Sequence, residues 1–206
     1  MMKHIQVVAF DCDGVMFDTE AVNKEYYNQI LRYMNKPDLM PEQFAFVHAH
    51  TADEAVFYLF RNESEALEAN AYRKLMPYLP FLEKMEIEPY LIPLLHRLRP
   101  TYPTAIATNR TNTIQRVVEG HSLVGLFDLV VSAWDVDHPK PHPDILNKIL
   151  RHFDIEPDQL LYIGDSEVDQ IAAEAAGAIL VAYKNPSLRS DFHITSLKEI
   201  EQILGL

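Results

Sequence analysis

Cysteine is almost absent from this sequence, which contains one cysteine among 206 residues. A single thiol cannot form an intramolecular disulfide, and it cannot supply the several thiolates of a structural zinc site. The cysteine content therefore excludes a disulfide-stapled scaffold, and it is typical of a protein from a reducing compartment. We accordingly expect a cytoplasmic location.

Basic residues are also few, with 18 Lys and Arg against 30 Asp and Glu and a formal net charge of −12. Binding to nucleic acid or to an anionic membrane surface requires a basic face. We therefore expect neither partner, and an anionic substrate has to be held by a few local cations. The sequence leaves the oligomeric state open, and a monomer is compatible with it.

Long hydrophobic runs, internal repeats and low-complexity tracts are lacking as well. The apolar run within Met1–Phe10 is much shorter than a membrane span, and no small-residue cleavage site of a signal peptide follows it. Hydrophobic residues nevertheless make up 48% of the chain. This composition predicts one well-buried core, or a core with a small inserted subdomain.

Five short apolar runs have the form of strands that are buried on both faces of a parallel sheet. They are Ile5–Phe10, Thr104–Thr108, Leu129–Ser132, Leu160–Gly164 and Ile179–Tyr183. Amphipathic or Ala-rich stretches such as Ile145–Phe153 and Val168–Ala176 lie between them. Strands that alternate with helices predict βαβ units, and therefore an α/β fold with a doubly wound, mostly parallel sheet.

Residues 16–84 differ from the rest of the chain, because they show helical periodicity without strand-like runs. A helical stripe runs from Val22 to Met34, and Thr51–Glu54 has the spacing of a capping box. We therefore predict an all-helical insertion at 16–84 in a core that is formed by residues 1–15 and 85–206.

The first predicted strand ends in Asp11, Cys12, Asp13 and Gly14. Side chains two positions apart in extended backbone point the same way, so both carboxylates can face one site beyond the carboxyl edge of the sheet. A nucleophile has to be ionised whereas an acid–base partner has to carry a proton; Asp11 fits the first role and Asp13 the second. A tight turn whose carboxylates bind backbone amides would explain the same residues. Alternation points Cys12 away from the site, as a small buried side chain.

The other strand ends carry residues that suit the same chemistry. Thr108 and Asn109 offer a hydroxyl and backbone amides to a phosphate oxygen, although a helix N-cap has the same residues. Lys140 stands between two prolines that stiffen its backbone, so it can hold one cation over a cluster of acids. Asp165 and Asp169 supply hard oxygen ligands of the kind that Mg²⁺ prefers. Because one parallel sheet would bring all these strand ends together, the residues predict a common site.

These motifs, in this order, resemble those of the haloacid dehalogenase-like superfamily, in its phosphoglycolate phosphatase and β-phosphoglucomutase branch. The matching segments are Asp11–Glu20, Thr108–Asn109, Lys140–Asp144, Gly164–Asp169 and Ala172–Gly177, which span nearly the whole chain. The resemblance implies a Rossmann-like catalytic core with a helical cap inserted after the first motif. It also implies hydrolysis of a small phosphorylated metabolite.

The resemblance further implies a role for each motif residue. Asp11 would form an aspartyl-phosphate, and Asp13 would protonate the leaving group and later activate water. Thr108, Asn109 and Lys140 would bind the oxygens of the phosphoryl group.

A magnesium site is implied by the same resemblance. The carboxylates of Asp11 and Asp165 and the backbone carbonyl of Asp13 would hold the ion. Asp169 would lie one layer behind these ligands and support them.

Two alternatives to a phosphatase remain open at this stage. Val15 stands where many phosphatases of this branch carry threonine, and valine also occurs in the phosphomutases. Thr108-Asn109-Arg110 looks more like the hydrolases, so we favour hydrolysis over a phosphomutase of the β-phosphoglucomutase type. The second alternative, a non-catalytic metabolite-binding module of the same fold, has no need of a nucleophile.

Residues outside the motifs are less informative. Arg61 and Lys74 are the candidates in the insertion for binding a substrate carboxylate or a second phosphate. His138 and His142 flank Lys140, and we interpret them as ordinary polar residues of a loop.

Overall fold

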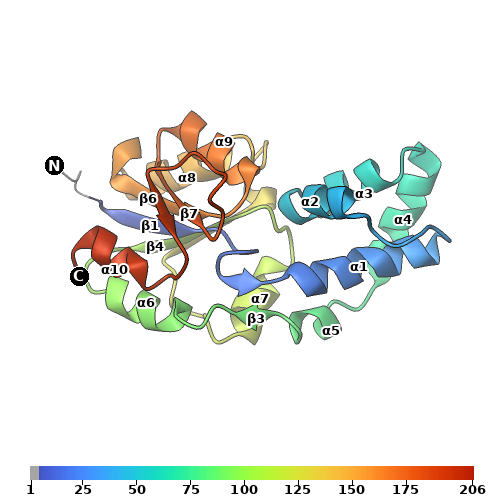
Figure 1. The fold of residues 1–206 in the computed structure, drawn as a ribbon, viewed down its shortest axis with the longest axis horizontal. Coiled ribbons are helices and arrows are strands. Elements are labelled where there is room, and N and C mark those ends of the chain that lie inside the picture. The colour runs from blue at the N-terminus through green and yellow to red at the C-terminus, as the bar shows by residue number, and fades with distance from the viewer. Residues whose placement is uncertain (1–4) are drawn as a thin grey trace.

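A six-stranded parallel sheet lies at the centre of the protein (Figure 1). The computed structural model describes residues 5–206; residues 1–4, which we included in the predicted core, lie outside the described residues. In spatial order the strands are β5 (Leu129–Ser132), β4 (Thr104–Thr108), β1 (Val7–Phe10), β6 (Leu160–Gly164), β7 (Ile179–Tyr183) and β8 (Phe192–Ile194). The chain proceeds outward from β1 to β5, returns to β6 on the other side of β1, and proceeds outward again. The predicted doubly wound, parallel sheet is thus confirmed, with its switch point beside β1.

Helices cover both faces of this sheet (Figure 1). One face is covered by α8 (Asp144–Phe153) and α9 (Glu167–Ala176), and the other by α6 (Leu91–Leu98), α7 (Ile114–Gly120) and α10 (Glu199–Leu204). Along β1, Val7 and Ala9 pack in the first of these layers, whereas Val8 and Phe10 pack in the second. Burial on both faces explains why the strands read as continuous apolar runs.

A separate group of helices lies beyond one end of the sheet (Figure 1). It consists of α1 (Glu20–Tyr33), α2 (Pro41–Ala49), α3 (Ala52–Leu59) and α4 (Glu63–Leu75), and we call these four helices the helical insertion. Their apolar side chains, among them Ile30, Val56 and Phe60, form a hydrophobic cluster of their own. The predicted capping box begins α3, because the Thr51 hydroxyl accepts from the Glu54 amide at 3.3 Å and the Thr51 amide donates to the Glu54 carboxylate at 2.9 Å.

The expectation that residues 16–84 are wholly helical is wrong at the start of this range. Phe17–Asp18 forms β2, which pairs with β3 (Glu86–Ile87) in a short antiparallel ribbon where the chain leaves and re-enters the core. Strands of two residues are too short to show an alternating pattern, so the sequence gives no sign of them.

The return from the helical insertion passes through α5 (Leu79–Leu82), whose Phe81 and Leu82 pack in the cluster beneath the sheet. The short 3₁₀ helices η1 (Ala133–Asp135) and η2 (Pro157–Gln159) lie in the connections that follow β5 and α8. Within residues 5–206, no helix combines the length and the apolar character that crossing a membrane requires.

Candidate functional site

A cavity of about 530 Å³ lies between the carboxyl edge of the sheet and the helical insertion. The lining residues on the sheet side include Asp11, Asp13, Thr108, Asn109, Lys140 and Asp165. Those from the helical insertion include Asn23, Tyr26, His48, His50, Arg73 and Lys74. The structure therefore brings the residues at the predicted strand ends together. Asp169 is fully buried directly behind them.

Lys140 is buried at the base of this cavity, with 2% of its surface exposed. Its ammonium group donates to Asp11 Oδ1 and to Asp169 Oδ1, both at 2.7 Å, and to the carbonyl of Ala107 at 3.0 Å. It also lies 2.9 Å from the Tyr162 hydroxyl. Burial alone would lower the pKa of Lys140, but the two carboxylates outweigh burial and hold that pKa above its ordinary value. Lys140 is therefore a permanent cation between two acids.

Asp11 follows β1 directly and is 7% exposed. Burial raises the pKa of its carboxyl group to about 7, with Lys140 acting against the rise and Asp169 and Asp13 adding to it. A buried carboxylate between other acids ionises fully only when further positive charge reaches it. Asp11 is thus poised between its two protonation states near neutral pH.

Asp13 forms a bidentate ion pair with Arg110, a residue that sequence reasoning did not assign to the site. Arg110 Nε and Nη2 each donate to a different carboxylate oxygen of Asp13, both at 2.6 Å. The pair is largely buried, with side chains that are 9% and 15% exposed. Burial alone would raise the pKa of Asp13, but the guanidinium outweighs it and the pKa lies below its ordinary value. Arg110 also donates to the Tyr78 hydroxyl, just before α5.

The acidic residues of the site have the donor chemistry of a magnesium centre. Asp11, Asp165 and Asp169 each place a carboxylate oxygen within 4.8 Å of the others. Burial, Asp169 and Asp11 hold the pKa of Asp165 well above its ordinary value, so the cluster is short of positive charge. An all-oxygen set of this kind suits Mg²⁺. The residues present therefore fit the ion that the motifs imply.

Asp169 is fully engaged by protein donors on both of its oxygens. Oδ1 accepts from Lys140 and Tyr162, while Oδ2 accepts from the backbone amides of Asp165 and Ser166 at 3.3 and 3.1 Å and from the Ser166 hydroxyl. These bonds position Asp169 as a support for its neighbours.

The residue at position 14 is a glycine because the backbone there passes very close to Asp165. A Cβ on Gly14 would lie 2.1 Å from Asp165 Oδ2, and the φ of Gly14 is +83°. Only glycine allows the first motif to pass this close to Asp165.

Asn109 joins three segments that are distant in the sequence. Its side-chain amide donates to the carbonyl of Lys140 at 2.8 Å and to the carbonyl of Ala49 at 3.2 Å, and its oxygen accepts from the Lys140 amide at 2.9 Å. Thr108 is buried beside it, and its hydroxyl accepts from the Arg110 amide at 3.0 Å. Asn109 therefore fixes the backbone of Lys140 and ties the helical insertion to the edge of the sheet.

Tyr162 and Arg110 are the site residues that the sequence analysis missed. Tyr162 stands in a buried apolar strand, where a tyrosine has the same appearance as any core side chain. Arg110 follows the Thr108-Asn109 motif directly, so its proximity to that motif was the available signal. Cys12, by contrast, packs with Val8 and Phe10 in the hydrophobic cluster, as alternation predicts.

The cations that the helical insertion contributes differ partly from those expected. Lys74 lines the cavity, and Arg73 beside it does so as well while pairing with Asp53 at 2.6 Å. Arg61 is not among the described residues that line the cavity. Arg61 precedes α4, whereas Arg73 and Lys74 lie near its end, and only tertiary packing decides which part of this segment meets the cavity.

Sequence comparison identifies related proteins along most of the chain. A sequence model of the family described as haloacid dehalogenase-like hydrolase matches residues 8–183. A pyrophosphatase PpaX from Bacillus cereus is 30% identical, over 98% of this chain and 97% of that protein. A phosphoglycolate phosphatase from Vibrio cholerae is 26% identical, over 85% of this chain and 83% of that protein.

Solved structures share the fold. A haloacid dehalogenase-superfamily hydrolase of subfamily IA, variant 1, from Geobacter sulfurreducens has 35% identity and a TM-score of 0.79, covering 98% of this chain and 97% of that chain. β-Phosphoglucomutase from Clostridium difficile has 17% identity and a TM-score of 0.83, covering 98% and 97%. At that identity the second likeness shows the fold alone.

Proposed function

The chain belongs to the haloacid dehalogenase-like hydrolase family, and from this premise we propose that it is a Mg²⁺-dependent phosphatase whose nucleophile is Asp11. One observation carries the proposal: Asp11 lies at the base of the cavity with its carboxylate held by Lys140 at 2.7 Å, beside Asp13, Thr108 and Asp165. A carboxylate in this position can attack phosphorus while the adjacent cation offsets the charge of the transferring group.

The reaction has two steps. Asp11 Oδ displaces the leaving oxygen from phosphorus and forms an aspartyl-phosphate, while Asp13 gives a proton to that oxygen. Asp13 then takes a proton from water, which attacks the phosphorus and releases inorganic phosphate and free Asp11. Each step thus uses one carboxylate as nucleophile or leaving group and the other as proton carrier.

The ion pair with Arg110 defines what Asp13 requires before the first step. Asp13 can donate a proton only after its bidentate contact with Arg110 loosens, since the guanidinium favours the ionised carboxylate. An anionic substrate is the natural competitor for Arg110, which lines the cavity. Substrate arrival and release of Asp13 are coupled in this proposal.

Thr108, Asn109 and Lys140 bind the phosphoryl oxygens. The Thr108 hydroxyl supplies a donor beside Asp11, and the Lys140 ammonium supplies positive charge there. The side chain of Asn109 is committed to backbone groups, so Asn109 contributes its backbone amide and its hold on Lys140.

Mg²⁺ would be held by the carboxylates of Asp11 and Asp165 and the carbonyl of Asp13, with Asp169 supporting them. When bound, the ion supplies positive charge that keeps Asp11 ionised and neutralises a phosphoryl oxygen. The convergence of three carboxylate oxygens within 4.8 Å supports this assignment.

The substrate is a small phosphorylated metabolite with a second anionic group. Beyond Lys140 and Arg110, the cavity is lined by Arg73, Lys74 and Arg116. These cations can bind a second anionic group while the reacting phosphoryl group lies at Asp11. Pyrophosphate and phosphoglycolate, after which the relatives are named, both have this form.

We also propose that residues 16–84 act as a cap over a catalytic core of residues 1–15 and 85–206. The separate hydrophobic cluster of the helical insertion and its position across the cavity support this division. Closure of such a cap would exclude water until the phosphoryl group has reached Asp11.

Replacing the nucleophile tests the mechanism. Asp11→Asn keeps the size of the side chain, so we expect an intact fold and a fall in phosphate release of about 10⁴-fold or more. Release is measured with Mg²⁺ and a panel that includes pyrophosphate, phosphoglycolate and sugar phosphates. Asp137→Asn, in an exposed loop, is the matched control and should retain full activity.

Two results would overturn the proposal. Turnover that survives in Asp11→Asn would exclude the aspartyl-phosphate. Isomerised sugar phosphate without release of phosphate, in the unmodified protein, would identify a phosphomutase instead.

A further inference from the structure

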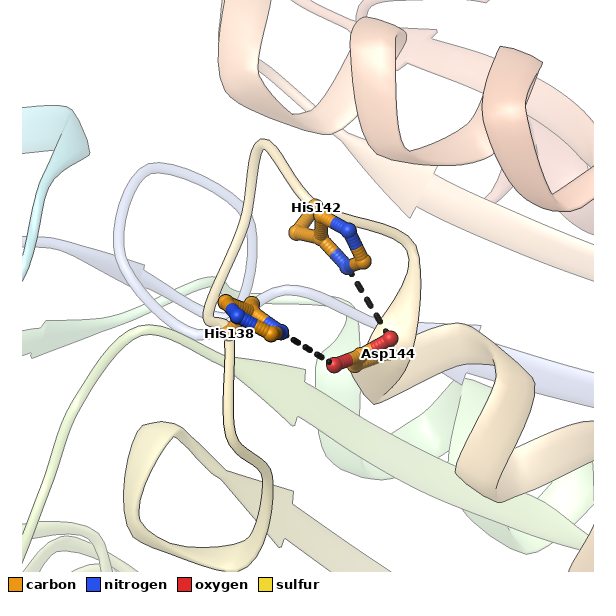
Figure 2. Close-up of side chains that lie close together, drawn as sticks. All are labelled: His138, His142 and Asp144. Atoms are coloured by element: carbon orange, nitrogen blue, oxygen red, sulfur yellow. Dashed lines mark hydrogen bonds and ion pairs between the residues drawn. The ribbon is translucent and has the colours of Figure 1, made fainter.

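A second group of side chains with metal-ligand chemistry lies on the loop that carries Lys140 and on the first residue of α8 (Figure 2). His138, His142 and Asp144 place a ring nitrogen or a carboxylate oxygen within 4.8 Å of one another. Lys140 turns inward and is 2% exposed, whereas the side chains of His138 and His142 point outward and are 66% and 52% exposed. The group is therefore separate from the cavity and open to ions in solution.

The distances between the potential ligand atoms are close to those between neighbouring ligand atoms around a bound zinc ion. Nδ1 of His138 lies 3.1 Å from one oxygen of Asp144, and Nδ1 of His142 lies 2.9 Å from the other. Bond lengths of about 2.0–2.2 Å in a tetrahedral zinc site separate neighbouring ligand atoms by about 3.3 Å. Small rotations of the side chains would thus admit an ion between them.

The backbone presets this arrangement. Proline occupies positions 139, 141 and 143, and each proline fixes one φ angle. The amide of His142 donates to the carbonyl of Pro139 at 2.9 Å, which closes the turn and brings the two imidazole rings to a centroid distance of 4.7 Å. Little conformational entropy remains to be lost when an ion binds.

The ligand atoms of His138, His142 and Asp144 indicate which kind of ion this group would prefer. Two imidazole nitrogens with one carboxylate favour zinc and its transition-metal neighbours, whereas the all-oxygen cluster of Asp11, Asp165 and Asp169 favours Mg²⁺. We propose that His138, His142 and Asp144 form a second cation site, which takes a divalent transition ion such as Zn²⁺. In the bound form each ring coordinates through Nδ1 and carries its proton on Nε2, with water completing the coordination.

Occupancy of this site has a structural consequence for Lys140. The ion would tie together the two ends of the turn whose middle residue places its ammonium group on Asp11 and Asp169. Zn²⁺ should therefore raise the melting temperature of the protein, because it binds the folded loop and not the unfolded chain.

A stoichiometric titration tests the proposal. Tag-free protein in excess Mg²⁺ is titrated with Zn²⁺ against a chromophoric chelator, and its melting temperature is recorded with and without Zn²⁺. We expect His138→Ala and His142→Ala each to weaken the binding of one equivalent by at least about tenfold and to abolish the thermal shift. His96→Ala, an exposed histidine of α6 on the other face of the sheet, is the matched control and should bind as the unmodified protein does.

Trp134, the single tryptophan of the chain, provides a second reading, since it lines the same surface depression as Asp144. Because Trp134 also lines the cavity, excess Mg²⁺ is kept in the solution to compete with Co²⁺ for the acidic cluster. Co²⁺ should quench its fluorescence in the unmodified protein and in His96→Ala, and much less in the two loop variants. Equal zinc binding and equal quenching in all four proteins would overturn the proposal. Loss of this equivalent of bound Zn²⁺ in Asp165→Asn would also overturn the proposal, because the ion would then be bound by the acidic cluster.

Discussion

Arg110 determines the form in which Asp13 occurs in this conformation of the protein. The two donors of the guanidinium occupy both carboxylate oxygens of Asp13, so the residue that carries a proton in the proposed mechanism is held as an anion. A buried ion pair of this kind is costly to break on one side only, since the remaining charge loses its partner without regaining water.

Replacement of Arg110 should therefore destabilise the protein in a pH-dependent way. We expect Arg110→Ala to lower the free energy of unfolding by about 3–5 kcal/mol at pH 7. The lowered pKa of Asp13 means that the pair adds stability above the ordinary carboxyl pKa of about 4 and loses it as the pH falls through the lowered value. In the variant, burial is no longer offset by the guanidinium, so Asp13 takes up a proton at a higher pH. The stability gap between the two proteins should be largest near pH 7 and narrow toward pH 4.5 in urea denaturation.

A matched pair isolates the effect of the carboxylate. Asp13→Asn and the double variant Asp13→Asn/Arg110→Ala carry no charge at position 13, so the gap between them should change much less with pH. A gap between the unmodified protein and Arg110→Ala that is equally flat would contradict the ion-pair argument.

The positions of residues at the strand ends could be predicted from the sequence. Asp11, Asp13, Thr108, Lys140 and Asp165 lie together because each follows a strand of one parallel sheet, as their order in the chain predicts. Tyr162 and Arg110 could not be assigned in the same way, because their contacts arise from packing between strands and loops.

Among the elements, β6 and α9 are tightly packed where they meet near the site. A Cβ on Gly164 would lie 2.5 Å from Cβ of Asp169 and 2.8 Å from its Cγ, so the first turn of α9 rests directly on the end of β6. The absence of a side chain at Gly164 is what lets Asp169 reach Lys140.

Gly164→Ala should therefore impair the site more than the fold. We expect a loss of about 1–3 kcal/mol of stability from overpacking, together with a clear fall in kcat as Asp169 is displaced from Lys140. Gly125→Ala is the control: its φ is +76° and nothing lies within 4 Å, so it should cost about 1–2 kcal/mol in stability without loss of activity. An equal kcat in the two variants, measured in the same phosphate-release assay, would refute the expectation.

The regular elements of the core were predictable because burial on both faces leaves a plain signal. The four later predicted strands have the bounds that the sequence indicates, and Gly177 ends α9 with a φ of +75°. The ribbon of β2 and β3 and the edge strand β8 escaped prediction because two or three residues carry no period. Helix α2 was not predicted either. Pro41 at its first turn is compatible with a helix start, but the residues after it are only weakly amphipathic and do not indicate a helix.

At the scale of the whole molecule, two hydrophobic clusters in the core and one in the helical insertion organise the chain. The apolar contact between the insertion and the core is local: Val22 of α1 packs in a core cluster, and Tyr26 and Met76 pack against clusters of both. Separate hydrophobic clusters of this kind would allow the proposed cap to move as a rigid body relative to the core.

Phe60→Ala tests the independence of the cap. Phe60 is 1% exposed within the cluster of the helical insertion, so the substitution should cost about 3–5 kcal/mol locally. Hydrogen exchange should show that protection is lost in α1–α4 while the strands of the sheet keep theirs. Ile149→Ala, in α8 and in the cluster between that helix and the sheet, should reduce protection in the core instead. Equal loss across the whole chain in both variants would mean that cap and core unfold as one unit.

The wall of the cavity is the part that no local pattern in the sequence revealed. Tyr26, His48, Arg73 and Arg116 come from four different helices or their ends and meet only in the folded chain. The grouping of polar residues at the edge of the sheet could therefore be predicted, whereas the composition of the cavity wall could not.

The contacts of Asn109 bear on how such a surface can change over time. Asn109 reaches the helical insertion through the carbonyl of Ala49, and it holds Lys140 through the amide and carbonyl of that residue. Peptide groups are the same whatever side chain they carry. Substitutions in the wall of the cavity can therefore accumulate, and new substrates can be acquired, while the link between cap and reaction centre is inherited unchanged.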